Sequence, residues 1–208
     1  IIFSKDRPAQ LEPLLRSLHV AYQDPETAPV TILYRSSAHY APAYLELARQ
    51  YGKYKFADEA KSASFKVALL AALEPAARIL MFLVDDQVFL RPFHLGELLE
   101  SFAKAGRNCA TVSLRLHPGI GYSYCFRSVS PPQTLTPDTL EVRWADEPAN
   151  SDWSVVMSLD GNLYRREDLF PILSGTDYAN PCFLEHQMVH GIPFSLDSFY
   201  LCQREPIV

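Results

Sequence analysis

The sequence lacks several features that would place it in a specialised class of protein. No apolar stretch approaches the roughly 20 residues that a helix needs to cross a bilayer, and no basic region followed by an apolar one opens the chain. We therefore expect a cytoplasmic protein with no transmembrane segment in this chain. The sequence also has no internal repeat and no low-complexity tract.

Runs of basic residues and paired cysteines are also missing. The formal net charge is −5, and duplex nucleic acids are bound largely by neutralising their phosphates, so we expect no nucleic-acid partner. The four cysteines are scattered without a C-x-x-C pair, which indicates neither a zinc site nor a disulfide-dense scaffold. We expect them to be mostly reduced and structural.

What is present is an ordinary globular composition with alternating strand and helix patterns. The chain has 208 residues, 48% of them hydrophobic and 21% charged, enough for one sizeable core. Short apolar runs predict strands, and apolar residues, many of them leucines, that recur at helical spacing predict the helices between them. The predicted strands are Ile1–Phe3, Val30–Tyr34, Lys53–Phe56, Ile79–Val84 and Cys109–Leu116. This βαβ series predicts an α/β, Rossmann-like fold with a mostly parallel central sheet flanked by helices.

Residues 118–150 interrupt the alternation with prolines and polar residues, and an apolar strand over Val155–Leu159 is predicted after them. Long loops in compact domains are usually functional or disordered, and we interpret this one as an excursion over the site. We therefore expect one domain over 1–208, with one half at 1–117 and a smaller half at 118–208.

Two adjacent carboxylates, Asp85 and Asp86, follow the buried run Ile79–Val84. Ligands of parallel α/β sheets collect at the carboxyl ends of the strands, and two neighbouring like charges there require a positive partner. Mg²⁺ or Mn²⁺ meets this need, because both take oxygen ligands and leave positions open for phosphates. Alternatively, one aspartate caps the next helix and the other faces water or pairs with an arginine such as Arg91.

Four segments in sequence order resemble the GT-A glycosyltransferases, a nucleotide-sugar transferase fold with a DxD-type acidic motif. The resemblance covers most of the chain and is closest to the family-2-like members. The segments are 1–11, with Ser4-Lys5-Asp6-Arg7 after the first strand; Leu83-Val84-Asp85-Asp86; Asp160-Gly161-Asn162-Leu163; and Ser174–Asp177 followed by Phe183-Leu184-Glu185-His186.

The resemblance implies that 1–117 is a nucleotide-sugar-binding half and 118–208 an acceptor-side half, and it gives each of these segments a role. Its nucleotide-contacting loop corresponds to Ser4, Lys5, Asp6 and Arg7, its acidic motif to Asp85 and Asp86, and its acceptor-site glycine to Gly161. We expect Asp86 to hold the metal. Asp85, its partner, would contact the ribose or a water molecule that is not itself bound to the metal.

A late histidine, here His190, can complete the metal shell in such enzymes; a helix-end position before Gly191 is the simpler explanation for it. Two positions depart from the family pattern. Gln87 stands where a strict DxD motif has an acid, and His186 stands in the second position of the expected acidic pair.

The chemistry of glycosyl transfer selects the remaining candidates. The departing diphosphate needs cations, for which Lys5, Arg7 and Arg115 are available beside the metal, although each also reads as a surface charge. The acceptor hydroxyl needs a general base, for which Glu185 and Asp160 are the candidates. Glu185 lies in an apolar helical patch, where burial would raise its pKa or where it pairs with a cation. Asp160 precedes a glycine and serves equally well to bind acceptor hydroxyls or to shape a turn.

The sequence therefore predicts a metal-dependent glycosyltransferase that moves a sugar, of hexosyl type, from a nucleotide diphosphate sugar to a carbohydrate or other hydroxyl acceptor, with inversion favoured over retention. One alternative is a sugar-nucleotide-binding protein whose centre has degraded. Another is a sugar-phosphate nucleotidyltransferase, although the loop 4–7 lacks the glycines typical of those enzymes. A flavodoxin-like regulatory domain also fits the alternation, but leaves the segments around Asp160 and Glu185 without a role.

Overall fold

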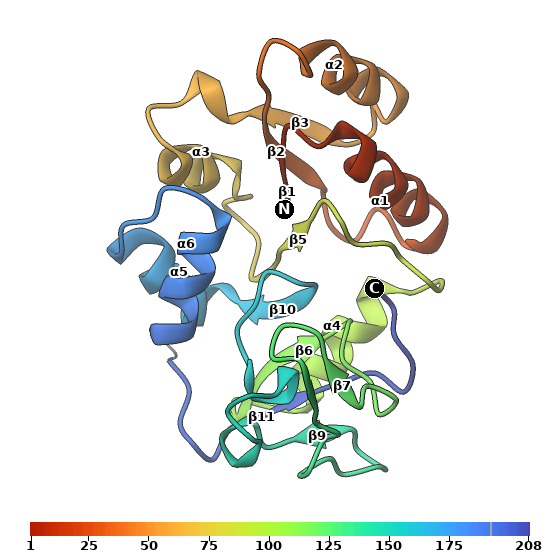
Figure 1. Ribbon diagram of the computed structural model, residues 1–208, viewed down its shortest axis with the longest axis vertical. Helices are drawn as coiled ribbons and strands as arrows, with labels where there is room; N and C mark the ends of the chain where they lie inside the picture. The colour runs from red at the N-terminus through yellow and green to blue at the C-terminus, as the bar shows by residue number, and fades with distance from the viewer. Residues whose placement is uncertain (192) are drawn as a thin grey trace.

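The structure, a computed structural model, describes residues 1–191 and 193–208 and contains two neighbouring sheets with helices on both faces (Figure 1). All strands of the first sheet are parallel, with Ile2 of the inner strand paired to Ile32 on one side and Leu83 on the other. In spatial order they are β3 (Lys55–Asp58), β2 (Thr31–Arg35), β1 (Ile2–Lys5) and β5 (Leu83–Val84). Their carboxyl ends therefore meet at one edge.

The second sheet is mixed. Two of its strands, β6 and β11, run parallel, and the other pairings are antiparallel. In spatial order the strands are β4 (Ile79–Met81), β10 (Asn162–Arg165), β6 (Cys109–Ser113), β11 (Phe199–Leu201) and β9 (Glu141–Val142). The prediction of an α/β fold with a parallel sheet is confirmed, and the mixed sheet extends it.

The predicted strand Ile79–Val84 is split between the two sheets. Its first half is β4, which pairs with β10, and its second half is β5, which pairs with β1. Phe82 lies at the break, fully buried, and its carbonyl accepts a hydrogen bond of 2.9 Å from the backbone N–H of Gly161. One continuous apolar segment thus joins the sheets, and its second half ends directly at Asp85.

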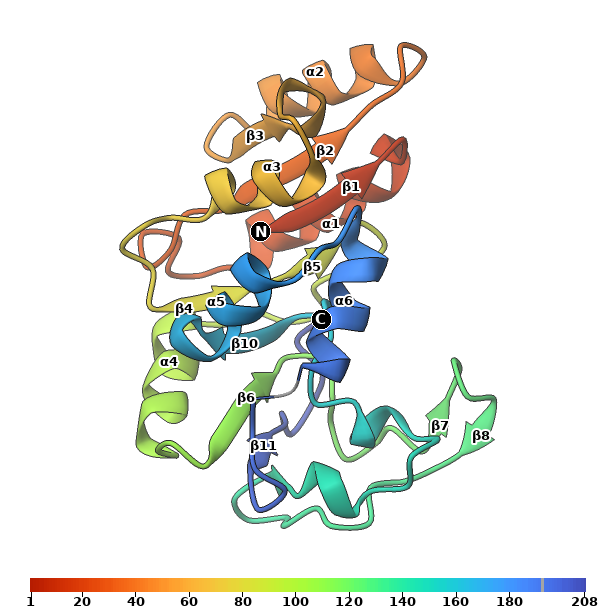
Figure 2. The same cartoon turned by 90° about the vertical axis from the view of Figure 1, so that its left-hand side faces the viewer.

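Helices cover both faces of the sheets, as expected for strands that are apolar on both sides. Neighbouring residues of β1 enter different cores: Ile2 packs with one cluster and Phe3 with the other. Leucine-rich faces of the helices complete each cluster (Figures 1 and 2). One cluster includes α1 (Pro8–Ala21), α2 (Ala41–Gln50) and α4 (Leu95–Lys104); the other includes α3 (Phe65–Ala72), α5 (Arg166–Gly175) and α6 (Pro181–His190).

The proline-rich segment is held to the body by buried side chains. Glu147 is buried and accepts hydrogen bonds from the backbone N–H groups of Gln133 and Thr134, at 2.9 and 2.7 Å. Trp153, also buried, donates from its indole N–H to the carbonyl of Ile120 at 3.2 Å. Between these anchors a small hairpin, β7 (Tyr122–Ser123) and β8 (Ser128–Val129), projects from the molecule (Figure 2). The segment is therefore an ordered excursion.

The strand predicted over Val155–Leu159 is wrong. These residues are largely buried but form no strand, because their backbone is bonded by a side chain: the hydroxyl of Tyr164 accepts from the N–H of Ser158 and donates to its carbonyl, both at 2.8 Å. The predicted strand at Cys109–Leu116 likewise ends at Ser113. In Val155–Leu159 and in Leu114–Leu116 the apolar residues reflect burial in the core and not pairing with another strand.

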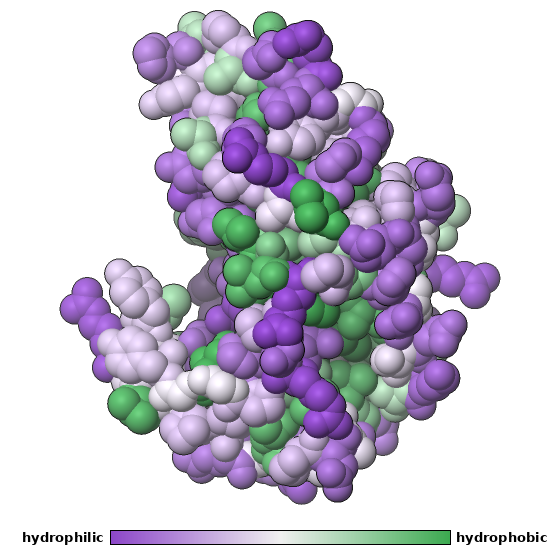
Figure 3. Space-filling model, turned by 90° about the vertical axis from the view of Figure 1, so that its right-hand side faces the viewer, coloured by the Kyte–Doolittle hydropathy of each residue, from purple (hydrophilic) through white to green (hydrophobic). Residues whose placement is uncertain are grey.

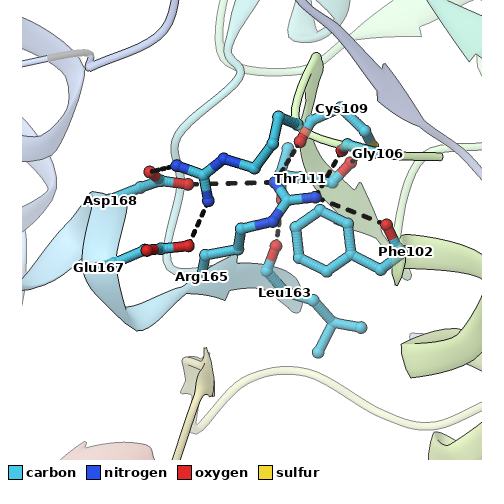
Figure 4. A network of polar contacts seen from close by, with 9 residues as sticks. Phe102, Gly106, Cys109, Thr111, Leu163, Arg165, Glu167 and Asp168 are labelled. Carbon is cyan, nitrogen blue, oxygen red and sulfur yellow. Dashed lines mark hydrogen bonds and ion pairs between the residues drawn. The ribbon is translucent and has the colours of Figure 1, made fainter. Parts of the chain in front are cut away.

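A cluster of charged side chains lies at the end of β10 away from Gly161 and consists of Arg107, Arg165, Glu167 and Asp168 (Figure 4). The guanidinium of Arg165 lies 4.1 Å from the ring centre of Phe102 and donates to the carbonyls of Cys109 and Gly106, at 2.5 and 2.6 Å. Arg165 thereby ties β10 to α4 and β6. We assign this cluster to the framework, because the donors of Arg165 are already used by carbonyl groups.

Two expectations from composition can be compared with the structure. All four cysteines are free thiols; Cys109 and Cys202 are buried, as expected for structural residues, whereas Cys125 and Cys182 are exposed. Among the described residues, no helix combines the length and apolar character that a membrane span requires.

Candidate functional site

The loop after β1 is fixed by contacts to neighbouring elements. The Ser4 hydroxyl is buried and lies 2.6 Å from the hydroxyl of Tyr44, which also accepts from the backbone N–H of Arg7 at 3.1 Å. Asp6 adopts φ 54°, and its carboxylate accepts from the N–H of Ser37 at 2.6 Å. These contacts fix the backbone at the start of α1, so the loop presents Arg7 at the carboxyl edge of the first sheet.

The paired aspartates lie at the same edge and share Arg7. The guanidinium of Arg7 lies 3.0 Å from Asp85 through one nitrogen and 3.1 Å from Asp86 through the other. Asp85 is buried, which raises the pKa of its carboxyl, whereas the charge of Arg7 acts to lower it. The side chain of Asp86 is 52% exposed and so remains open to a ligand.

The positive partner that the sequence required is therefore Arg7. Arg91, the arginine suggested from sequence, instead pairs with Glu205. Gln87 turns back onto the strand end, where its side-chain oxygen accepts from the N–H of Val84 at 3.0 Å. Its amide oxygen is thus engaged in the turn, which leaves the two adjacent aspartates as the acidic motif.

Asp160 and Glu185 form a second acidic group, placed by a turn and a helix. Glu185 projects from α6, and one of its carboxylate oxygens accepts from the N–H of Leu159 at 3.0 Å. Burial is the main cause that raises the pKa of both carboxyls. The charge of Asp160 raises the pKa of Glu185 further. The raised pKa expected for Glu185 is confirmed.

The two acidic groups interact electrostatically. The charge of Asp86 raises the pKa of Asp160, as does that of Asp152, whereas Arg115 lowers it. Arg115 lies just beyond β6 and is 3.8 Å from Asp152. The two acidic groups, Asp152 and the two arginines thus comprise five carboxylates and two guanidinium groups, an excess of three negative charges if all are ionised.

Asp152 was missed in the sequence. It lies in a short 3-10 helix after the proline-rich segment, where no apolar periodicity marks an element. A buried tryptophan follows it, and the pair Asp152-Trp153 is the only local signal.

Gly161 has a structural reason to be glycine. It adopts φ 77°, and a Cβ at this position would meet the side chain of Val208 at 2.7 Å. Its N–H bonds to Phe82 and its carbonyl accepts from Leu114, both at 2.9 Å. Gly161 therefore lets the backbone pass between two strands next to Asp160.

Two predicted residues are not drawn into this group. Lys5 is exposed at the end of β1. His190 bonds through Nδ1 to the carbonyl of His186 at 2.8 Å and its ring packs on the ring of His186, which is the helix-end arrangement. Within residues 1–191 and 193–208, no three His, Cys, Asp or Glu side chains converge to hold a metal ion.

Asp86 nevertheless suits a divalent cation that is bound together with a ligand. Mg²⁺ is usually held by one or two carboxylates plus the phosphates of a substrate, with water in the remaining positions. The exposed Asp86 provides such a carboxylate, and Asp85 lies beside it. The residues present therefore fit a metal shared with a phosphate ligand, and a metal held by protein alone does not fit them.

The acids lie at an open edge of the molecule. The β7–β8 hairpin projects on the side toward which β1 points, and the outline is indented above it (Figures 2 and 3). Two apolar-lined cavities lie elsewhere, one of about 430 Å³ around Ile1, Thr31 and Leu80 and one beside Phe102 and Arg165. Neither contains the acidic residues, so we place the site at the open edge on chemical grounds.

Comparison with known proteins gives a match of fold. No family model matches the chain, and no curated protein matches its sequence. Among solved structures, S. aureus TarS 1-349 superposes with a TM-score of 0.52 at 16% identity, over 97% of this chain and 59% of that one. The complex of TarS 1-349 with UDP gives 0.51 at 16% identity, over 98% and 59%. A longer TarS structure gives 0.51 at 17% identity, over 97% and 36%.

The chain thus spans 59% of the length of TarS 1-349. At this level of identity the likeness concerns the arrangement of strands and helices, and the activity must be argued from the site. The chain has the GT-A-like α/β fold of S. aureus TarS. In this chain, Asp85 and Asp86 lie at the carboxyl edge of the parallel sheet.

Proposed function

We propose that the chain is a glycosyltransferase that moves a sugar from a nucleotide diphosphate sugar to an acceptor hydroxyl, with Mn²⁺ or Mg²⁺ bound alongside the donor. The observation that carries the proposal is the gathering of Asp85, Asp86, Asp160 and Glu185 at one edge of a TarS-like fold. One TarS structure is a complex with UDP, which supports a uridine diphosphate sugar as the first donor to test.

The charge of the site supports a metal. A sugar diphosphate is an anion, and the edge already carries more carboxylates than guanidinium groups. When bound at Asp86, a divalent cation supplies stabilisation of the negative charge that develops on the leaving diphosphate. Arg7 contributes beside it, because it directly precedes α1, and the N-terminal end of a helix dipole favours anions.

The acceptor side is assigned to Asp160 and Glu185. Glu185 already accepts from the N–H of Leu159, so its carboxylate holds the turn that carries Asp160. Among the contacts of the described residues, none engages the carboxylate of Asp160, and its pKa is raised mainly by burial. We assign Asp160 as the general base and Glu185 as the residue that positions it.

The reaction follows from this arrangement. The acceptor oxygen forms a bond to the anomeric carbon while the bond from that carbon to the diphosphate oxygen breaks. Asp160 takes the proton of the acceptor hydroxyl, and the nucleoside diphosphate leaves with the bonding electrons. A single displacement of this kind inverts the anomeric configuration, so inversion is part of the proposal.

Binding of nucleotide tests the donor side. We expect UDP or GDP with Mn²⁺ to raise the melting temperature more than either component alone, because the cation offsets the repulsion between the diphosphate and the carboxylates. Asp86→Ala should weaken Mn²⁺-dependent nucleotide binding at least about tenfold, as expected for removal of a metal-bridging carboxylate. Isothermal titration calorimetry measures the affinity. Asp138→Ala, at an exposed carboxylate of the proline-rich segment 118–150, is the matched control. Unchanged affinity in Asp86→Ala contradicts the assignment.

Turnover separates a transferase from a protein that only binds sugar nucleotides. Incubation of UDP-sugars with Mn²⁺ and a panel of hydroxyl acceptors should release UDP, by transfer or by slow hydrolysis. Tight, metal-dependent binding without any release of UDP would favour the binding protein.

A further inference from the structure

The guanidinium of Arg7 lies where a cation at the aspartate pair would lie. Its two nitrogens contact Asp85 and Asp86 at 3.0 and 3.1 Å, so one side chain bridges both carboxylates. A divalent ion at Asp86 and the guanidinium in this position would be like charges only a few ångströms apart. Because like charges this close repel one another strongly, the two cannot both keep this position.

Arg7 is free to leave, in contrast to other arginines of the chain. Its side chain is 45% exposed, and among the described residues its guanidinium contacts only the two aspartates. Arg165, by comparison, has a side chain 12% exposed and is held by the carbonyls of Cys109 and Gly106. Movement of Arg7 therefore breaks one ion pair with the buried Asp85 and one with the exposed Asp86, and no hydrogen bond to a backbone carbonyl such as those that hold Arg165.

The backbone of Arg7 stays in place while its side chain moves. Its N–H donates to the hydroxyl of Tyr44, which also bonds Ser4, and α1 begins at the next residue. A swinging guanidinium thus remains anchored at the edge where a diphosphate would lie. Guanidinium groups bind phosphate oxygens in the same two-pronged way as carboxylates, so a diphosphate is an equivalent partner.

We propose that Arg7 is an internal counter-cation: it neutralises Asp85 and Asp86 before the donor arrives, and passes to the donor diphosphate when a divalent cation takes Asp86. This inference rests on the proposed function and adds a consequence to it. The cation alone must displace Arg7 without compensation, whereas cation and diphosphate together offer Arg7 a new partner. Metal and nucleotide therefore promote one another's binding, by the same factor in both directions.

Binding of Mn²⁺ alone tests this directly, because it requires no turnover. The electron paramagnetic resonance signal of free Mn²⁺ gives its dissociation constant with and without UDP. In the wild-type chain we expect weak Mn²⁺ binding that UDP strengthens. Arg7→Gln should bind Mn²⁺ alone roughly fivefold more tightly or better, while its affinity for UDP with Mn²⁺ falls, so the mutual enhancement shrinks. Arg7→Lys, which keeps one charge but cannot bridge, should lie between the two.

Arg16→Gln is the matched control. Arg16 lies on α1 and, among the described residues, forms its ion pair with Glu12 one turn away, so its loss should leave both affinities unchanged. Far-ultraviolet circular dichroism verifies folding of each variant. Since Arg7→Gln leaves Asp85 without its charged partner, Arg7→Lys provides the reading if the glutamine variant does not fold.

The outcomes are distinguishable. If the wild-type chain binds UDP with Mn²⁺, but loss of the Arg7 bridge leaves binding of Mn²⁺ alone unchanged or weaker, Arg7 does not compete with the cation and this inference is overturned while the proposed function stands. If no form of the chain binds UDP with Mn²⁺, the proposed function fails and the inference fails with it.

Discussion

The two acidic groups of the site are built in different ways. Asp85 and Asp86 follow a strand of the parallel sheet and are bridged by a guanidinium at 3.0 and 3.1 Å. Asp160 and Glu185 come from a turn and a helix, and among the described residues neither has an ion pair. Burial raises the pKa of Asp160 and of Glu185; the hydrogen bond from the N–H of Leu159 opposes this shift at Glu185, and the charge of Arg115 opposes it at both. The first group suits cations and the second suits acceptance of a proton, because carboxylates acquire different roles from different surroundings.

The largest expected effect concerns which acid takes the proton. Asp160→Asn should lower kcat by about 10²–10⁴-fold, the usual contribution of a general base, with donor affinity retained. Glu185→Gln should cost less, because an amide oxygen can still accept from the N–H of Leu159. Steady-state kinetics with a UDP-sugar and an identified acceptor measure both. The reverse order of losses would make Glu185 the base and break the division of roles drawn here.

The next effect concerns the turn that holds Asp160. Gly161→Ala introduces both a left-handed alanine and a contact of 2.7 Å with Val208, so we expect a loss of roughly 2–4 kcal/mol in the free energy of unfolding. Gly106→Ala is the matched control, since it has φ 76° but open space around the added methyl group, and should cost only about 1 kcal/mol. Urea denaturation gives both values. Equal losses would mean that the chain end at Val208 yields freely and that the turn is not clamped.

The smallest effect concerns stability as a function of pH. A carboxyl whose pKa is raised by folding binds its proton more tightly in the folded state, so its ionisation at neutral pH destabilises the fold. Asp160→Asn removes this cost and should raise the melting temperature at pH 7.5 by roughly 2–4 °C, equivalent to about 1 kcal/mol for a chain of this size. The gain should shrink as pH falls toward about 4, where the unfolded carboxyl is also protonated.

Differential scanning fluorimetry across this pH range measures the gain. Asp138→Asn, at an exposed carboxylate, should show no such trend. A gain for Asp160→Asn that is independent of pH would arise from packing and would remove the contrast in charge between the two acidic groups.

The sequence predicted the first acidic group better than the second, for physical reasons. A buried apolar run followed by Asp85 and Asp86 specifies a strand end, and parallel strands collect such ends at one edge. That edge was therefore predictable. The identity of the cation was not, because Arg7 is 78 and 79 positions from the two aspartates in the sequence and reaches them through the pairing of β1 with β5.

The second group depended on contacts that periodicity does not encode. The residues before Asp160 are apolar because they are buried, and their backbone partner is the hydroxyl of Tyr164, which no alternation of residue types reveals. The break at Phe82 was missed for a similar reason: both halves of the run are apolar, and only pairing with different strands separates them. Asp152 gave no helical or strand signal at all.

The hydrogen bond between the carbonyl of Phe82 and the N–H of Gly161 fixes the spacing between the segments that carry the two acidic groups. On one side of it the chain reaches Asp85 after three residues, and on the other side Asp160 is the immediate neighbour of Gly161. Under the proposed function, main-chain contacts therefore set the distance between the diphosphate at Asp86 and the attacking hydroxyl at Asp160.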